Sequence, residues 1–541
     1  MKTSPLLFLT LAAALLAWLR RSGVLLLLAG VAATGQAQIP WQLSFSETNR
    51  ILETSSPANN HTQYGIVLAG QTVVVTASNQ AINVYRLTGF TNVTTIVTNA
   101  ATPYTNSSLA VGHYFIETSG DRRTLAVLPS DFGRPSLSGA HSTRNNSIHG
   151  SLNNATYPAW ERVSGGALAT WEMVETNQSL LNTTLLNTYF VAATNNTRTV
   201  LVFEASVNSV PAWLTTNGLT FAQWRDQVVV ASTNYMRQVL ELYSGYPLDY
   251  WEPLNEPSIP YAVWNTTANK TNFIYELTRA AWYYANIQTN IANLKIMGIS
   301  EQSPSWLGTM FNTLCAAGMS NYFDAYSYHH YPSSNNVDNI PYENALYWHP
   351  GAGAKPLWIG EEGIMGESSL GVRSTANSNS VVTYSGIPWY TGMRRGTKVA
   401  VLYKAVGATG IVPHMQGAAA YTYNHEPDEV CGFEMGGGTV DNTRGPHPKN
   451  SAFLMACYRL QGYSPQSFTY HVVGSTTNAW TATFTNNLTQ LTVKACVDGY
   501  TTNVSVSGAS DVWGDAYSWG TLADESAFFT SPLQWTGQVE P

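Results

Sequence analysis

Strand-like and helix-like segments alternate along the middle of the chain, and this alternation limits the possible fold more than any other feature. Short runs rich in β-branched and aromatic residues, typical of buried strands, are separated by longer amphipathic stretches. A βα series of this length predicts a (β/α)8 TIM barrel over residues 129–465, because a closed parallel barrel leaves no open sheet edge. We expect strands over 199–206, 248–254, 294–300, 323–331, 356–362 and 409–415, with two weaker ones at 130–136 and 167–174.

The barrel segment has β-rich sequence on both sides. Residues 82–87 and 113–118 read as short strands between turn residues, and residues 480–486 and 490–497 do the same near the C-terminus. We therefore predict an α/β chain with an N-terminal β-sandwich over 38–128 and a C-terminal β-sandwich over 466–541.

The N-terminus resembles an export signal. Two apolar runs flank Arg20 and Arg21, and the small residues Gly35 and Ala37 precede Gln38. This pattern predicts a signal peptide over 1–37 and a secreted protein, extracellular or periplasmic, with no stable membrane span after its removal. An uncleaved membrane anchor stays open as the alternative, although neither run reaches the ~20 residues that span a bilayer.

Charge and cysteine content exclude several partner classes. The formal net charge is -7, so no basic surface for nucleic acid is expected. The four cysteines match no zinc or redox spacing. Cys431 and Cys457 could form a disulfide in an exported protein, or the cysteines could be isolated buried thiols. No metal and no organic cofactor is predicted.

Two glutamates follow predicted barrel strands. Glu256 comes just after 248–254 and is preceded by Asn255, which can hydrogen-bond a substrate hydroxyl, and Glu361 ends 356–362. Functional residues of such barrels lie at these carboxyl ends. Glycoside hydrolysis needs two carboxyl groups there, one to protonate the leaving group and one ionised. The alternative is that a Glu simply favours a helix N-terminus. Trp251 in the same motif is a candidate for substrate binding.

A third strand end carries Tyr328, His329, His330 and Tyr331. These side chains could be packing residues. The strand lies between the two carboxylate strands in sequence, however, so its end should face the same cavity. The Tyr331 hydroxyl could then hydrogen-bond the nucleophile and orient it. His414, at the end of the last predicted strand, is a further candidate for the lining of the site.

These motifs resemble clan A glycoside hydrolases, the group that contains families 5, 10, 39 and 51. The matching elements are Asn-Glu after strand 4, His-x-Tyr after strand 6 and Glu-x-Gly after strand 7. The segment 211–214 also resembles family 39 and its relatives. The resemblance implies retention of β configuration, Glu256 as acid/base, Glu361 as nucleophile and a carbohydrate substrate. The His-x-Tyr and Glu-x-Gly spacings select His329 over His330 and Glu361 over Glu362.

The chain also departs from the clan pattern. The clan has an Arg at the end of strand 2, and 167–174 contains none. Either that strand is misplaced, or Arg134 or Arg162 takes the role. The last predicted strand offers His414 where the clan often has Trp.

The hypothesis is therefore a secreted retaining β-glycosidase that hydrolyses poly- or oligosaccharides. Two alternatives stay open: an inactive carbohydrate-binding protein on the same barrel, and a transglycosylase.

Overall fold

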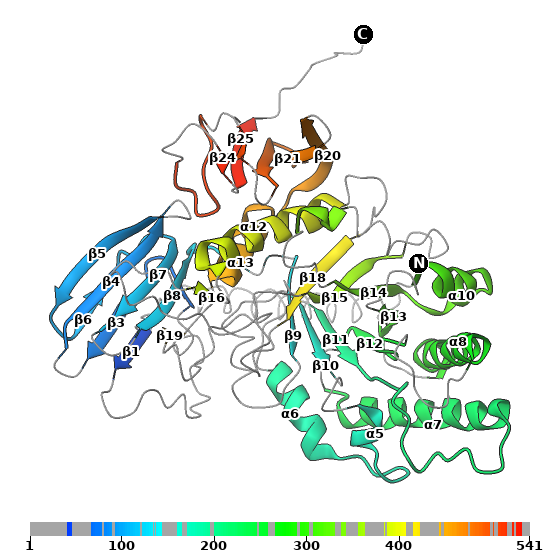
Figure 1. Cartoon of the computed structure of the whole chain (residues 1–541). Coiled ribbons are helices and arrows are strands. Elements are labelled where there is room, and N and C mark those ends of the chain that lie inside the picture. Colours follow the sequence, from blue (N-terminus) through cyan, green and yellow to red (C-terminus); the bar gives the residue numbers. More distant parts are fainter. Residues whose placement is uncertain are drawn as a thin grey trace, which may run out of the picture.

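A computed structural model of the chain provides the architecture. Apart from internal gaps of at most three residues, it describes residues 41–45, 66–142, 160–164, 170–194, 200–257, 266–288, 293–301, 307–330, 337–341, 355–362, 383–406, 415–421, 443–473, 476–502, 507–516 and 522–532. The predicted signal segment 1–37 lies outside the described residues. Figure 1 shows sheets from the N-terminal part of the chain on the left, a barrel with helices on the right, and a C-terminal sheet above.

Two sheets with a common apolar core form the N-terminal part. The smaller has the order β1-β3-β6, and the larger has the order β19-β8-β7-β4-β5, with β2 also paired to β8. Val73, Val75, Ile82, Val84 and Leu125 contribute to the core. The strands are β1 (Trp41–Phe45), β2 (Ile66–Leu68), β3 (Val73–Ala77), β4 (Ile82–Thr88), β5 (Asn92–Ala100), β6 (Tyr104–Asn106), β7 (Gly112–Glu117), β8 (Arg122–Leu128) and β19 (Thr443–Arg444).

The larger of these sheets is not made from one continuous segment. β19 pairs in parallel with the start of β8, while β2 pairs with its end. The boundary at residue 128 stays a prediction, because residues far along the chain complete this sheet.

Eight parallel strands close into a barrel. Their order is β10-β11-β12-β13-β14-β15-β18-β9, and the ring closes where β18 pairs with β9. The strands are β9 (Ser138–Ser142), β10 (Trp160–Ser164), β11 (Val200–Glu204), β12 (Tyr250–Glu252), β13 (Lys295–Glu301), β14 (Ala325–His330), β15 (Leu357–Glu362) and β18 (Met415–Tyr421).

The predicted strands 3 to 7 coincide with β11 to β15, but the other three were misplaced. The first strand is β9 at 138–142, because residues 130–133 form a turn. The second is β10 at 160–164, whereas Trp171–Val174 form a short helix. The last is β18 at 415–421, so the prediction of 409–415 was about one strand length too early.

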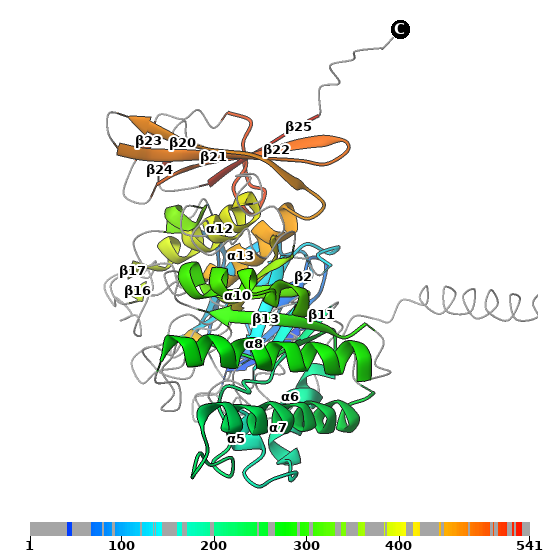
Figure 2. The ribbon, with the colours of Figure 1, turned by 90° about the vertical axis from the view of Figure 1, so that its right-hand side faces the viewer.

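Helices follow most of the barrel strands and cover the outside of the ring (Figure 2). Helix α7 shows why they form: Thr220 and Gln223 make a reciprocal capping box, and Trp224, Val228, Tyr235 and Val239 share its buried face. The described helices are α5 (Trp171–Val174), α6 (Thr183–Thr194), α7 (Phe221–Leu242), α8 (Thr267–Tyr283), η1 (Tyr284–Gln288), η2 (Leu307–Phe311), α10 (Asn312–Ala316), η3 (Met319–Tyr322), η4 (Val337–Asn339), α12 (Trp389–Val406) and α13 (Pro448–Arg459).

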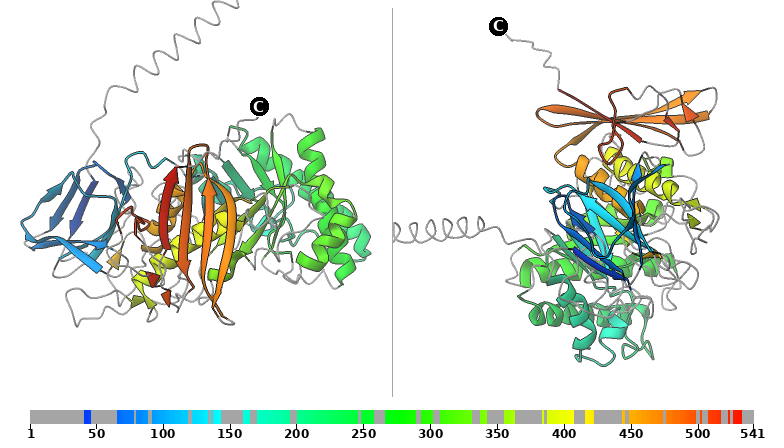
Figure 3. Two further views of the ribbon diagram at one scale, coloured as in Figure 1. Left: turned by 90° about the horizontal axis from the view of Figure 1, so that it is seen from above. Right: turned by 90° about the vertical axis from the view of Figure 1, so that its left-hand side faces the viewer.

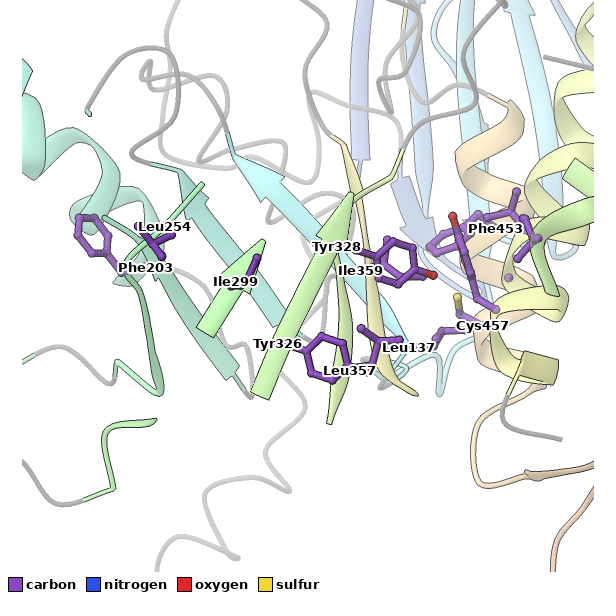
Figure 4. Close-up of a cluster of buried hydrophobic side chains, with 14 of the residues drawn as sticks. Leu137, Phe203, Leu254, Ile299, Tyr326, Tyr328, Leu357, Ile359, Phe453 and Cys457 are labelled. Atoms are coloured by element: carbon purple, nitrogen blue, oxygen red, sulfur yellow. The ribbon is translucent and has the colours of Figure 1, made fainter. Parts of the chain in front are cut away.

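The main hydrophobic core lies between the barrel strands and these helices. Phe203 of β11, Ile299 of β13 and Ile359 of β15 belong to it, and Phe453 and Cys457 of α13 extend it (Figure 4). In β14, for example, Tyr326 and Tyr328 belong to this outer core, which leaves the alternate residues Ser327 and His329 on the interior face.

The C-terminal part is a four-stranded antiparallel sheet that lies over α12 and α13 (Figures 2 and 3). Its strands are β20 (Ser464–Val473), β21 (Thr476–Thr485), β22 (Thr489–Cys496) and β25 (Ser526–Pro532). Two small ribbons, β16 (Thr383–Tyr384) with β17 (Ile387–Pro388) and β23 (Thr501–Thr502) with β24 (Leu522–Ala523), complete the described strands. In the part of the chain that the structure describes, this sheet packs on a helix, so the predicted C-terminal sandwich stays a prediction.

Three cysteines can be placed, and all three are buried: Cys315, Cys457 and Cys496. Cys431 lies outside the described residues. No described helix combines the length and the hydrophobicity needed to cross a membrane.

Candidate active site

The floor of the barrel interior is apolar. Val202, Tyr250, Met297, Ala325 and Trp358 form a small core of their own, with one residue from each of five strands. The Tyr250 and Trp358 rings meet edge to face at 5.7 Å although two strands separate β12 from β15, so they meet across the interior. This layer closes the barrel below the site.

Above the floor, one arginine holds two carboxyl groups. Arg162 Nε lies 2.9 Å from Glu252 Oε2, its NH2 group also contacts Glu252 Oε1, and its NH1 group lies 3.0 Å from Glu204 Oε2. All three side chains are fully buried. Burial raises the pKa of Glu252, and the guanidinium opposes that rise. Arg162 is on β10, the second barrel strand, which was predicted at 167–174. Of the two arginines proposed for this strand, Arg162 therefore does lie in the barrel interior.

Glu256 stands at the mouth of the barrel, four residues after β12. Its backbone has a φ of +43°, which is uncommon for a residue other than glycine. The Glu256 N–H donates to the Ser300 carbonyl at 2.8 Å, and the side chain is 16% exposed. The carboxyl group is therefore held by neighbouring strands while part of it stays open to solvent.

His329 makes the contact to this carboxyl group. Its Nδ1 lies 2.7 Å from Glu256 Oε1, and its Nε2 lies 2.8 Å from Ser300 Oγ, which is 2.9 Å from Ser327 Oγ. When Glu256 is ionised, Nδ1–H donates to it and the Ser300 hydroxyl can donate to Nε2. The predicted choice of His329 over His330 fits this contact.

The register of β14 and β15 places Glu361 beside His329. Ser327 pairs with Trp358, but after a register shift His329 pairs with Glu361 and His330 with Glu362. Without the shift His329 would pair with Gly360, and Glu361 would take the outward position. Residues paired across parallel strands share a face of the sheet, so Glu361 takes a position on the interior face, where His329 lies.

Two further residues that were predicted to bind substrate can be placed, Asn255 and Trp251. The prediction for Trp251 was wrong. The Oδ1 atom of Asn255 accepts from Arg162 NH2 at 3.0 Å, so its amide nitrogen is the group left to donate to a ligand. Trp251 is only 1% exposed and packs against Phe203 and Tyr235 in the outer core. Its predicted contact with substrate was wrong, because strand alternation turns it toward helix α7.

Tyr331 and His414 lie outside the described residues, as does Arg134. Glu361 and Glu362 are described as strand positions only, so the separation of the two carboxyl groups stays a prediction.

Sequence reasoning missed Ser300 and Asn208. Ser300 bonds His329 and the Glu256 backbone, and Asn208 bonds the backbone of Asn255. Nothing in the local sequence around either residue signals these roles, because each partner is 29 or more residues away in the chain.

No protein-family model and no curated protein matches the chain. A solved structure does match. A family 39 glycoside hydrolase from the gut symbiont Bacteroides cellulosilyticus WH2 aligns over 86% of this chain and 98% of its own, with a TM-score of 0.57 and 14% identity. At this identity the match shows a shared fold: the chain folds like this structure.

Weaker matches include the catalytic domain of a family 30 xylanase C from Talaromyces cellulolyticus, with a TM-score of 0.41 and 14% identity over 74% of this chain and 96% of the other. A conserved exported protein from Bacteroides fragilis matches with a TM-score of 0.44 and 12% identity over 74% and 98%. In (β/α)8 enzymes the carboxyl ends of the strands carry the functional groups. Glu256, His329 and the position of Glu361 meet at that end.

Proposed function

We propose that the chain is an exported retaining β-glycosidase that hydrolyses oligo- or polysaccharides, with Glu256 as acid/base and Glu361 as nucleophile. One observation carries the proposal: the register shift that gives Glu361 the interior position beside His329, which itself holds Glu256. A carboxyl group held by His329 and a second glutamate on the neighbouring strand match the needs of double displacement, for which we expect the two carboxyl groups to be about 5–5.5 Å apart.

In the first step Glu361 attacks the anomeric carbon and forms a glycosyl ester. The bond to the leaving oxygen breaks, and Glu256 gives that oxygen its proton. Because His329 bonds Oε1 of Glu256, the other carboxyl oxygen is free to carry this proton. The Asn255 amide nitrogen donates to a sugar hydroxyl beside the scissile bond.

In the second step Glu256, now a carboxylate, takes a proton from water, and the water oxygen displaces Glu361 from the anomeric carbon. The sugar leaves with its original configuration. Nδ1–H of His329 stabilises the ionised Glu256 between the two steps. Neither step calls for a metal or an organic cofactor.

Azide distinguishes the two roles. On an activated aryl β-glycoside, Glu256→Ala should stall at the glycosyl ester, and azide should speed its turnover and yield the β-glycosyl azide. In Glu361→Gly azide should replace the nucleophile and yield the α-azide. NMR of the anomeric proton identifies each product. An α-azide from Glu256→Ala, or wild-type rates in both variants, would overturn the assignment, and binding of sugar without any hydrolysis would favour the inactive-barrel alternative.

Export is proposed from the N-terminal sequence. The mature protein should begin near Gln38, which N-terminal sequencing of protein from the native host can check. Met1 retained in a membrane fraction would instead favour an anchor.

A further inference from the structure

The peptide bond between Asn255 and Glu256 is held at both ends. Its carbonyl oxygen accepts from Asn208 Nδ2 at 2.7 Å, and its N–H donates to the Ser300 carbonyl at 2.8 Å. Asn208 makes a second bond one residue back, where its Oδ1 accepts from the Asn255 N–H at 3.2 Å. The plane of this peptide is therefore fixed by the turn after β11 on one side and by β13 on the other.

The fixed peptide explains how Glu256 stays in a strained conformation. A φ of +43° at a glutamate costs about 1–3 kcal/mol and persists only where neighbouring groups determine it. Rotation of the peptide would let Glu256 return to negative φ. That rotation would break the bonds to Asn208 and Ser300. Once φ of Glu256 is free to change, the direction in which its side chain leaves the backbone is no longer fixed toward His329.

Asn208 is suited to this task because it is rigidly placed. It is 1% exposed and lies in the turn after β11, where the Ser209 N–H donates to the Ser206 carbonyl at 2.9 Å and Ser206 also has positive φ. The Val207 N–H donates to the Pro253 carbonyl at 2.8 Å, so the turn is joined to the strand end that carries Glu256.

We propose that Asn208 is a positioning residue for the acid/base, which it aims at the leaving-group oxygen by fixing the Asn255–Glu256 peptide. The proposal rests on the proposed function. A misplaced Glu256 cannot protonate the leaving group, whereas attack by Glu361 is unaffected. Loss of Asn208 should therefore harm substrates in proportion to their need for protonation.

The test compares kcat/KM of wild type and Asn208→Ala on aryl and alkyl β-glycosides of graded leaving-group pKa. For a dinitrophenyl glycoside, which leaves without help, the loss should stay below about threefold. For an alkyl glycoside the loss should reach about a hundredfold, the lower range of general acid catalysis. On the dinitrophenyl glycoside kcat should fall, and azide should restore it.

Two further variants make the result decisive. Asn208→Asp keeps the volume and the acceptor for the Asn255 N–H but loses the donor, so it should show the same graded loss even if Asn208→Ala folds poorly. Asn187→Ala removes an asparagine whose Oδ1 bonds the Tyr243 hydroxyl at 2.7 Å on the helical side, and should be unchanged. An equal loss on all substrates in both Asn208 variants would overturn the role of Asn208 and leave the proposed function intact. A wild type inactive on every glycoside would overturn both.

Discussion

At the scale of single residues, Gly360 shows how closely the barrel interior is packed below the site. A Cβ at this position would collide with Ser327 Oγ and lie 3.0 Å from Ser300 Oγ. Both hydroxyls belong to the chain of bonds that ends at His329 and Glu256. A side chain at 360 would therefore push directly on the support of the acid/base.

We expect Gly360→Ala to destabilise the protein by about 1–3 kcal/mol, the usual cost of overpacking, and to lower activity. Because Ser327 Oγ is the nearest atom, Ser327→Ala in the Gly360→Ala background should restore part of the loss, with a coupling of at least about 0.5 kcal/mol in a double-mutant cycle. Urea unfolding measures both effects. Gly245→Ala is the control, since a Cβ there meets nothing within 4 Å. Additive effects of the pair would show that the two positions do not collide.

Tyr331 gives a second prediction at this scale. If its hydroxyl bonds Glu361, Tyr331→Phe should lower kcat/KM by roughly 10–100-fold, the value of a hydrogen bond to a charged group, with the melting temperature kept. Tyr328→Phe is the control, because Tyr328 of β14 lies in the outer core. Unchanged kinetics in Tyr331→Phe would mean that Tyr331 is a packing residue.

The residues that sequence reasoning placed on a barrel strand and those that it could not place differ in one respect. Asn255 and Glu256 follow a strand, and His329 lies near the end of another, that their own apolar runs make recognisable. Arg162, by contrast, lies in the strand Trp160–Ser164, where a charge at a central position argues against burial. Its partners, Glu204 and Glu252, are brought to it only by closure of the barrel. No local pattern predicts a charge that is neutralised by residues so far along the chain.

At the scale of secondary-structure elements, contacts with residues far along the chain also explain the misplaced strands. β9 reads Ser-Gly-Ala-His-Ser and has no apolar run, so it is held by its neighbours β10 and β18 rather than by its own propensity. Residues 171–174 were predicted as part of a strand but form a helix. Trp171 and Val174 are both buried, and their spacing of three residues is that of a helix. The long helices and strands 3 to 7 were predictable because their periodicity is carried by their own residues.

The contact between the N-terminal sheet and helix α13 contains a buried histidine. His113 of β7 bonds Ser451 Oγ of α13 at 3.0 Å, and burial lowers its pKa to about 3. In the unfolded chain His113 takes up a proton near its ordinary pKa of 6.5, whereas in the folded protein it stays neutral down to about pH 3. Above pH 6.5 His113 therefore has no effect on the free energy of unfolding, and below pH 6.5 that free energy decreases as the pH falls toward 3.

We therefore expect acid to weaken this contact, by about 3 kcal/mol between pH 7 and pH 4. His113→Gln keeps a polar group for Ser451 but does not titrate, so its unfolding free energy should fall less over the same interval. His471→Gln is the control, because His471 is exposed on the C-terminal sheet. Equal pH dependence in wild type and His113→Gln would exclude His113 as the cause.

At the scale of the whole molecule, a buried ion pair joins the C-terminal sheet to the barrel. Lys398 of α12 lies 3.1 Å from Asp338 Oδ1, and Trp480 Nε1 of β21 donates to the same oxygen at 2.7 Å. The Tyr470 hydroxyl of β20 donates to the Asp338 carbonyl at 2.6 Å. Asp338 is in the helical turn that follows β14, the strand of His329. The sheet therefore helps to hold the helical turn η4 in place.

Trp480→Phe should lower the unfolding free energy by about 1–3 kcal/mol, because it leaves one oxygen of a buried carboxylate with fewer donors. Trp513→Phe loses the same indole group at a buried site where the ring nitrogen has no partner among the described residues, and should cost less. Thermal and urea unfolding compare the two. A chain cut after residue 465 that still melted at the wild-type temperature would contradict a supporting role for the sheet.

Strand β19 affects the order in which the sheets of the protein can be assembled during synthesis. It comes from residues 443–444, yet it covers the start of β8 in the N-terminal sheet. At ribosomal speeds of roughly 5–20 residues per second, the wait between the two is on the order of tens of seconds. During that time the edge at β8 is open to any passing strand. The first sheet to be made is therefore among the last to be completed, and its newly synthesised edge is where a chaperone would be most useful.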